Sequence, residues 1–239
     1  ACRRTLPFQG NNTNKNQDMR NSGKIIFAVM LLVSMLPLTS CGKSEAPGLS
    51  SGGVGGNEGG TSEEYKYPKP SQSAIRLMTY NSYYCRGNTG TPAVSQTNTE
   101  NFARVIKALD ADIVAIQELD KGALNRNKRD LLQEIADATG IDYQVVFAPA
   151  ADYMGGKIGP GVLVKRSLGV KSTKTVELPG DEGRMLVVVE TDGFVFLGTH
   201  LDLNDEARRR SATIINEVSN GCRKPVFLAG DLNDSLIHI

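Results

Sequence analysis

VFLAGDLND, residues 226–234, begins as a run of apolar, β-forming residues and then changes abruptly to acidic and amide side chains. Two earlier stretches have the same form, because DIVAIQELD (112–120) reaches a glutamate and VFLGTHLDL (195–203) reaches a histidine. Strands that end in carboxylate, imidazole and carboxamide groups can present a site for a hard metal ion and a phosphate. Since the three stretches lie far apart in sequence, only a shared sheet edge would bring them together. The pattern therefore favours an α/β or sandwich scaffold.

The composition limits the class of protein. The chain has 239 residues, which is enough for one substantial domain. Its 27 basic and 26 acidic residues leave a net charge of +1, and this balance gives no electrostatic argument for a nucleic-acid partner. The 4 cysteines form no CxxC motif, so neither a zinc cluster nor a dense disulfide framework is predicted. Cys85 and Cys222 could pair in an oxidising compartment.

The N-terminal part is predicted to be a targeting segment rather than part of the fold. Residues 1–18 precede a candidate start methionine and are interpreted as upstream sequence. Residues 19–41 combine a basic start, an apolar run too short to span a bilayer and a final Leu-Thr-Ser-Cys. This order predicts a bacterial lipoprotein signal peptide with Cys41 as the lipidated residue, the alternative being an ordinary secretory signal with a chance cysteine. We therefore expect a lipid anchor in the bacterial cell envelope.

Residues 42–72 are rich in Gly, Ser, Glu and Pro, which predicts a flexible tether. The remaining residues, 73–239, are expected to form one domain in which strand-like and helical segments alternate. An Asp-Gly turn after Thr191 joins two strand-like runs into a hairpin. Helices are predicted to begin at Thr97, which has an acidic residue three positions later, and at Asn204. Many strands, an antiparallel hairpin and helices between the strands favour two sheets sandwiched by helices over a doubly wound parallel sheet.

The acidic and amide residues at the strand ends are the candidates for metal and phosphate chemistry. Glu118 offers an oxygen ligand that suits Mg²⁺ or Mn²⁺, and its alternative interpretation is a solvated strand-end carboxylate. Asp231 and Asn233 alternate along one stretch, so both side chains are expected on the same side. The alternative for this pair is an Asx turn that closes the strand. Asn81 ends the first strand-like run in the same manner.

His200 is one of only 2 histidines in the chain. A histidine can donate or accept a proton near neutral pH, or bind a phosphate oxygen. Its alternative role is structural, as a hydrogen-bonded core histidine. Asp202 lies two positions later and is expected on the same face.

Four motifs in this order, MTYN (78–81), DIVAIQELD, GTHLDL (198–203) and LAGDLND (228–234), resemble the endonuclease/exonuclease/phosphatase superfamily, which has the fold of pancreatic deoxyribonuclease. The resemblance runs from about residue 75 to the end of the chain. It implies a four-layer α/β/β/α sandwich of the deoxyribonuclease I type and hydrolysis of a phosphoester by metal-assisted attack of water. The motifs do not select a substrate, so nucleic acid, a phospholipid head group and a small phosphate ester all remain open.

The resemblance also implies roles for single residues. Glu118 would ligate Mg²⁺ or Mn²⁺ with Asn81 beside it, and His200 would contact or protonate the phosphoryl group. Asp231 would orient the attacking water, and Asn233 would bind the phosphate. Three further residues are expected to contact substrate: Asp202, Tyr153 in a glycine-rich stretch, and Arg184.

The sequence departs from the superfamily pattern after Asn233. Members continue with further strands and a Ser-Asp-His-type motif, whereas the remaining residues here are DSLIHI, and His238 has no aspartate before it. This predicts a fold that is incomplete at the C-terminus, and a chain that is weakly active or inactive although the full-length protein would be a hydrolase. The alternative is a non-catalytic surface lipoprotein that uses the sandwich as a binding module.

Overall fold

The computed structural model describes residues 67–86 and 95–234. The predicted upstream sequence (1–18), the signal peptide with Cys41 and most of the tether lie outside these residues, as does His238. Contacts with the domain begin before residue 73. The backbone amide of Tyr67 donates to the Ala108 carbonyl, and the Lys69 ammonium lies 2.7 Å from Asp112. Within the described part, no helix combines the length and the apolar character that crossing a bilayer requires.

Nine strands and three α-helices form the described part of the chain. They are β1 (Leu77–Asn81), α1 (Gln96–Ala108), β2 (Ile113–Lys121), α2 (Leu131–Thr139), β3 (Tyr143–Phe147), β4 (Ala151–Tyr153), β5 (Gly156–Lys165), β6 (Ser172–Leu178), β7 (Arg184–Glu190), β8 (Val195–His200), α3 (Asp205–Asn220) and β9 (Val226–Asp231). Short 3₁₀ turns lie at Tyr83–Cys85, Leu124–Arg126 and Arg166–Leu168.

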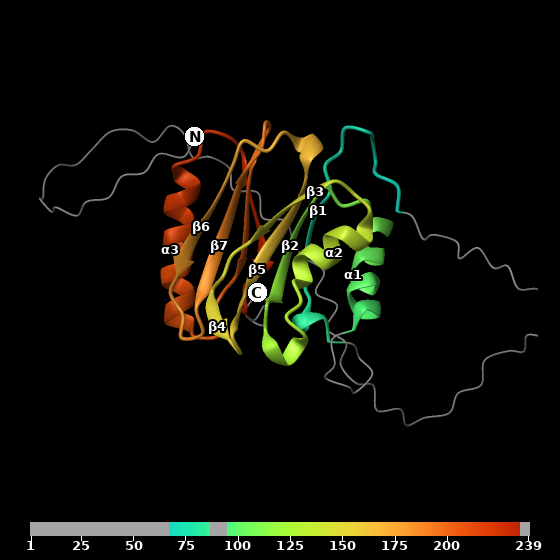
Figure 1. The fold of residues 1–239 in the computed structure, drawn as a ribbon. Coiled ribbons are helices and arrows are strands. Elements are labelled where there is room, and N and C mark those ends of the chain that lie inside the picture. Colours follow the sequence, from blue (N-terminus) through green and yellow to red (C-terminus); the bar gives the residue numbers. More distant parts are fainter. Residues whose placement is uncertain (1–66, 87–94, 235–239) are drawn as a thin grey trace, which may run out of the picture.

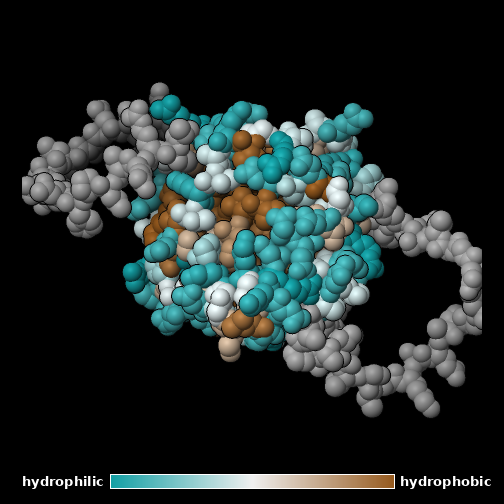
Figure 2. Space-filling view, in the orientation of Figure 1, coloured by the Kyte–Doolittle hydropathy of each residue, from teal (hydrophilic) through white to brown (hydrophobic). Residues whose placement is uncertain are grey.

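The strands form two sheets. One has the order β1-β2-β5-β3 with β4 also paired to β5, and the other has the order β6-β7-β8-β9. The sheets pack face to face, with α1 and α2 outside the first sheet and α3 outside the second (Figure 1). The α/β/β/α sandwich predicted from the sequence is therefore confirmed. Figure 2 shows hydrophobic residues in the middle of the same view, over the strands, in largely hydrophilic surroundings.

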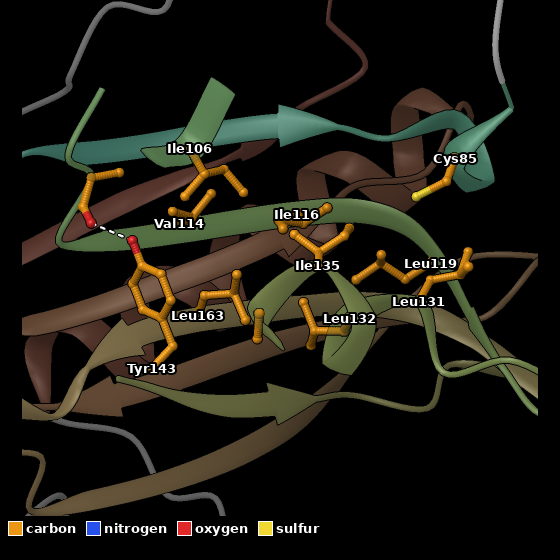
Figure 3. Packing of buried hydrophobic residues seen from close by; sticks show 12 residues of the cluster. Cys85, Ile106, Val114, Ile116, Leu119, Leu131, Leu132, Ile135, Tyr143 and Leu163 are labelled. Atoms are coloured by element: carbon orange, nitrogen blue, oxygen red, sulfur yellow. Dashed lines mark hydrogen bonds between the residues drawn. The ribbon is translucent and has the colours of Figure 1, made fainter. Parts of the chain in front are cut away.

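Three layers of buried side chains hold the sandwich together. In the layer between the first sheet and its helices, Ile106 of α1 and Ile135 of α2 lie next to Val114 and Ile116 of β2 (Figure 3). Leu132 of α2 belongs to the same layer. Each of these side chains is fully buried, and burial of one such aliphatic group stabilises the fold by about 1.5–3 kcal/mol. A second layer fills the space between the sheets, and a third lies under α3.

The two cysteines of the described domain belong to different layers. Cys85 is fully buried in the layer under α1 and α2, whereas Cys222 packs against the layer under α3. No disulfide joins them.

The site is positioned by two parallel strand pairs, β1 with β2 and β8 with β9. A helix connects the strands of each pair, α1 in the first and α3 in the second. Because parallel strands end at the same edge of a sheet, Asn81 lies opposite Gln117, and His200 opposite Asp231.

The helix caps follow local chemistry, with Asn204 capping α3 as predicted. The cap of α1 is Ser95 rather than Thr97, so that prediction was wrong by two residues.

Candidate active site

Asn81 joins the ends of the two sheets. Its side-chain nitrogen Nδ2 donates to Glu118 Oε1 at 2.9 Å and to Asp231 Oδ2 at 3.0 Å. Its oxygen Oδ1 accepts the backbone amide of Tyr83 at 2.9 Å, which fixes the orientation of the carboxamide. Three residues from distant parts of the sequence thus meet at one point. The convergence expected from the strand-end pattern is present, with Asn81 acting as the donor that links the two carboxylates.

Glu118 lies at a β-bulge and not at the end of its strand. The register of β2 against β5 shifts between Ile116 and Leu119, so that Gln117 and Glu118 together oppose Pro160. Glu118 has a φ of 55°, a left-handed backbone that is costly for a residue with a side chain. The expectation that the strand stops at Glu118 was therefore wrong, because β2 continues to Lys121. The bulge turns the carboxylate toward Asn81.

The bulge is held by the residue that follows Asn81. Ser82 Oγ lies 2.9 Å from the carbonyl oxygen of Gln117 and 2.8 Å from that of Glu118, and its backbone amide donates to Gln117 at 3.0 Å. Ser82 is buried, so these bonds are made away from solvent. They satisfy carbonyl groups that the irregular pairing of the bulge would otherwise leave without partners.

His200 stands beside Asp231 across the parallel pair β8–β9. Its Nε2 atom is 3.9 Å from Asp231 Oδ2, longer than a hydrogen bond but close enough for electrostatic interaction. Burial lowers the pKa of His200, and the positive charge of Arg184 lowers it further, while Asp231 and Glu118 act in the opposite direction. Since the net shift is downward from an ordinary value of 6.5, the imidazole is mainly neutral at pH 7.

Asn233 lies in an Asx turn, which is the alternative that the sequence left open. Its backbone amide donates to Asp231 Oδ1 at 3.0 Å, and its φ is 49°. Strand β9 ends at Asp231, so the two side chains do not alternate along one strand as expected. The Asn233 side-chain amide donates to the Leu201 carbonyl at 2.7 Å. That bond uses one of the two N–H groups of the side-chain amide.

Arg184 and Asp202 form a buried ion pair behind the site. The two side chains are 9% and 6% exposed, and Arg184 Nε lies 3.2 Å from Asp202 Oδ2. Asp202 also accepts the backbone amide of Asn204, and this bond, followed by the bond from Arg184, lowers the pKa of the Asp202 carboxyl. Arg184 reaches the site, whereas Asp202 is turned toward Arg184 and the start of α3.

A small cavity of about 30 Å³ marks the centre of the site. Its size suits one or two water molecules or a comparable group. It is lined by Tyr84, Glu118, Ala150, Ile158, Gly159, Pro160, Glu182, Gly183, Arg184 and His200. A larger apolar hollow of about 450 Å³ lies beside α3 and β9, but it contains none of these polar groups. The chemistry of the side chains therefore places the site at the smaller cavity.

Tyr84 is a site residue that the sequence analysis missed, while Tyr153 is set back from the cavity. Tyr84 lines the cavity, and burial raises the pKa of its hydroxyl, with a further contribution from the nearby charge of Glu118. Tyr153 is bonded to Asn125 at 3.2 Å and packs on Arg126, which in turn packs on Tyr84. The only sequence signal for Tyr84 is its place three residues after Asn81.

The donor set is compatible with one hydrated divalent cation. No group of three or more His, Cys, Asp and Glu side chains suited to a metal occurs in residues 67–86 and 95–234. Magnesium, however, usually retains several waters and is held by only one or two protein carboxylates. Glu118 and Asp231 both approach the same Asn81 amide, so two hard oxygen ligands converge there. The identity of the ion stays a prediction.

Gly230 allows β9 to lie close to β8 at the residue before Asp231. A Cβ atom at Gly230 would lie 2.1 Å from the Thr199 carbonyl oxygen of the neighbouring strand. We therefore expect Gly230→Ala to separate β9 from β8 and to lower the free energy of unfolding by about 1–3 kcal/mol. Urea unfolding measures this change. Gly193→Ala is the matched control, because a Cβ at Gly193 meets nothing within 4 Å, and equal losses in both variants would contradict the steric argument.

The fold is shared with solved structures of low sequence identity. An endonuclease/exonuclease/phosphatase structure from Beutenbergia cavernae is 22% identical with a TM-score of 0.52, covering 66% of this chain and 47% of that protein. A truncated TDP2 from Caenorhabditis elegans is 18% identical with a TM-score of 0.50, covering 69% of this chain and 64% of that one. The chain thus spans between about half and two thirds of these two structures.

A third similar structure, an endonuclease/exonuclease/phosphatase family protein from Leptotrichia buccalis, is 19% identical with a TM-score of 0.50 and covers 69% of each chain. No curated protein matches the sequence. The model of the Endonuclease/Exonuclease/phosphatase family matches residues 78–239, which include all four strand-end motifs. The chain belongs to the endonuclease/exonuclease/phosphatase family.

Proposed function

We propose that this protein is a metal-dependent phosphoester hydrolase. The observation that carries the proposal is the meeting of Glu118 and Asp231 at the Asn81 amide, at 2.9 and 3.0 Å, with His200 3.9 Å from Asp231. Two carboxylates held this close repel one another unless a cation lies near them. Membership of the family supports the same reaction class.

The proposed cofactor is Mg²⁺ or Mn²⁺, held by Glu118 with Asn81 beside it. When bound, such an ion neutralises charge on phosphate oxygens and makes the phosphorus more open to attack. Asp231 Oδ2 faces both Asn81 and His200, so it is the oxygen placed to orient the attacking water.

The remaining polar groups would bind the phosphoryl oxygens. His200, being mainly neutral, would hydrogen-bond one of them through a ring N–H. Arg184 lines the same cavity and would supply positive charge to the phosphoryl group, with Asp202 holding its guanidinium in place. The predicted phosphate contact of Asn233 would be made by the second N–H of its side-chain amide, because the first is bonded to the Leu201 carbonyl.

The location and the substrate are proposals from the sequence alone. A lipoprotein signal peptide over residues 19–41 would place the protein at the bacterial cell envelope, anchored to the membrane through Cys41. Nucleic acid, phospholipid head groups and small phosphate esters are the candidate substrates. The site chemistry is common to all three, since each presents a charged phosphoryl group.

Hydrolysis of bis(p-nitrophenyl) phosphate and binding of Mn²⁺ together test the proposed function. We expect one Mn²⁺ to bind per chain by titration calorimetry, and we expect slow nitrophenolate release that stops on addition of a chelator. Calorimetry is included because it detects the site even where turnover is slow. Absence of hydrolysis would overturn the proposal, and absence of Mn²⁺ binding as well would favour the binding-module alternative.

A further inference from the structure

The cavity beside Glu118 is lined by both polar and apolar residues. The proposed function uses Glu118, Arg184 and His200 among them. Tyr84 lines the same cavity together with Ala150, Ile158 and Pro160 of the β4–β5 region. A phosphoryl group would lie against the polar residues. Because the cavity is only about 30 Å³, the group attached to the phosphate would extend along the remaining lining residues, among them Tyr84.

Tyr84 is held by an unusual stack of side chains. The Arg126 guanidinium lies 4.3 Å from the centre of the Tyr84 ring and 4.9 Å from the centre of the Tyr153 ring. Arg126 is itself buried and is bonded to the fully buried Asp120 at 2.5 Å. A planar guanidinium attracts the faces of aromatic rings, and an ion-paired one cannot turn away easily. One face of Tyr84 is therefore covered, which leaves its other face or its edge for the cavity.

The backbone around Tyr84 is also strained and firmly held. Tyr83, Tyr84 and Cys85 have φ values of 47°, 55° and 53°, three consecutive left-handed residues without a glycine. Such conformations persist only where the surroundings enforce them, and they cluster at functional sites. Here the Cys85 side chain is buried in the core, and Asn98 donates to the Cys85 carbonyl at 2.8 Å. These contacts fix the place of the Tyr84 ring next to Glu118.

We infer that Tyr84, positioned by Arg126 and Asp120, is a specificity-determining residue that favours phosphoesters with a planar, unsaturated group attached to the phosphate. The inference rests on the proposed function, because it needs the phosphoryl group to lie at Glu118 and His200. A flat π-system can pack on the free surface of the tyrosine ring, whereas a puckered aliphatic group of the same size makes poorer contact. Arg126 is a positioning residue that acts through Tyr84.

Phenyl phosphate and cyclohexyl phosphate provide a matched pair of probes, because they have the same charge and number of carbon atoms and differ in planarity. Their affinities for the Mn²⁺-loaded protein are measured by calorimetry, which needs no turnover. We expect the wild type to bind phenyl phosphate on the order of fivefold to tenfold more tightly. Tyr84→Leu should remove this preference, and Tyr84→Phe should retain it.

Tyr83→Leu is the matched control, because Tyr83 lies in the same turn but is 60% exposed and does not line the cavity. It should retain the preference. Arg126→Lys keeps a positive charge beside Asp120 but loses the planar stack, so we expect a reduced preference with little change in the affinity for cyclohexyl phosphate. Thermal unfolding of each variant shows that it is folded, and the tyrosine variants decide the question if Arg126→Lys is unstable.

The outcomes separate this inference from the proposed function. A wild type that shows the phenyl preference without hydrolysing any ester supports the role of Tyr84 and counts against the hydrolase. A hydrolase that binds both phosphates equally, or whose preference survives in Tyr84→Leu, overturns the role of Tyr84. Failure of the protein to bind either phosphate overturns the inference as well.

Discussion

Glu118→Gln is expected to weaken Mn²⁺ binding by on the order of a hundredfold or more. Loss of a group that only hydrogen-bonds to a metal ligand already lowers metal affinity by about 10–100-fold. The substitution removes the charge of the proposed ligand but keeps an oxygen that can accept from Asn81. Because the repulsion between Glu118 and Asp231 also disappears, the free energy of unfolding should stay unchanged or rise. Calorimetry with Mn²⁺ and urea unfolding measure the two effects on the same sample.

Two further variants test whether the metal lies at Glu118. Glu182 lines the same cavity, but its carboxylate is paired with Arg184 at 2.8 Å, so Glu182→Gln should change Mn²⁺ affinity by only a few-fold. Glu118→Gly should abolish binding while it relieves the left-handed backbone, whose cost is about 1–2 kcal/mol. A larger loss of affinity in Glu182→Gln than in Glu118→Gln would place the ion elsewhere and contradict the proposed ligand.

The sequence predicts the layers of this fold and the meeting of its strand ends, because both depend on local patterns. Apolar runs mark the strands, helical periodicity marks the helices between them, and a helical connection is typical of a parallel strand pair. The carboxyl ends of parallel strands then share an edge, which brings Asn81 near Glu118 and His200 near Asp231. Asn204 could be recognised as a cap because capping involves only neighbouring residues.

Features that depend on contacts between distant segments could not be predicted. The bulge at Glu118 exists because β2 has one residue more than the facing part of β5, and neither stretch shows this by itself. The Asx turn at Asn233 was among the alternatives that the sequence offered, but the bond from its side chain to the Leu201 carbonyl, after a different strand, was not. Tyr84 became visible as a site residue only through its packing on Arg126 and its place in the cavity wall.

Arg126→Ala is expected to lower the free energy of unfolding by about 3–5 kcal/mol, the typical cost of removing one partner from a buried ion pair. Asp120 is fully buried, and within the described residues its Oδ1 atom has no hydrogen-bond partner. Burial already raises the pKa of the Asp120 carboxyl, and Arg126 is the main influence that lowers it. Without Arg126 the variant must bury an uncompensated charge or take up a proton.

The loss of unfolding free energy in Arg126→Ala should depend on pH, because the pKa of Asp120 is raised in the folded state. A carboxyl whose pKa is higher in the folded state than in the unfolded state destabilises the fold as the pH rises above its unfolded value. Removal of Arg126 raises the folded pKa of Asp120 further, so the destabilisation should be smaller at pH 5 than at pH 8. Urea unfolding of wild type and Arg126→Ala at both values measures the difference, and an equal loss at both would show that Asp120 does not carry the cost.

The Lys157–Asp152 pair is the control for burial. Its N···O distance of 2.5 Å equals that of Arg126–Asp120, but its side chains are 51% and 86% exposed, against 6% and 0%. Lys157→Ala should therefore change stability by less than about 1 kcal/mol, as is usual for surface pairs. Replacing both buried partners, as in Asp120→Leu with Arg126→Met, should recover much of the loss of Arg126→Ala because no buried charge remains. If Lys157→Ala and Arg126→Ala were equally destabilising, the contribution of each pair to stability would depend on its N···O distance and not on its burial. The argument that burial of the Arg126–Asp120 pair holds the stack behind Tyr84 would then fail.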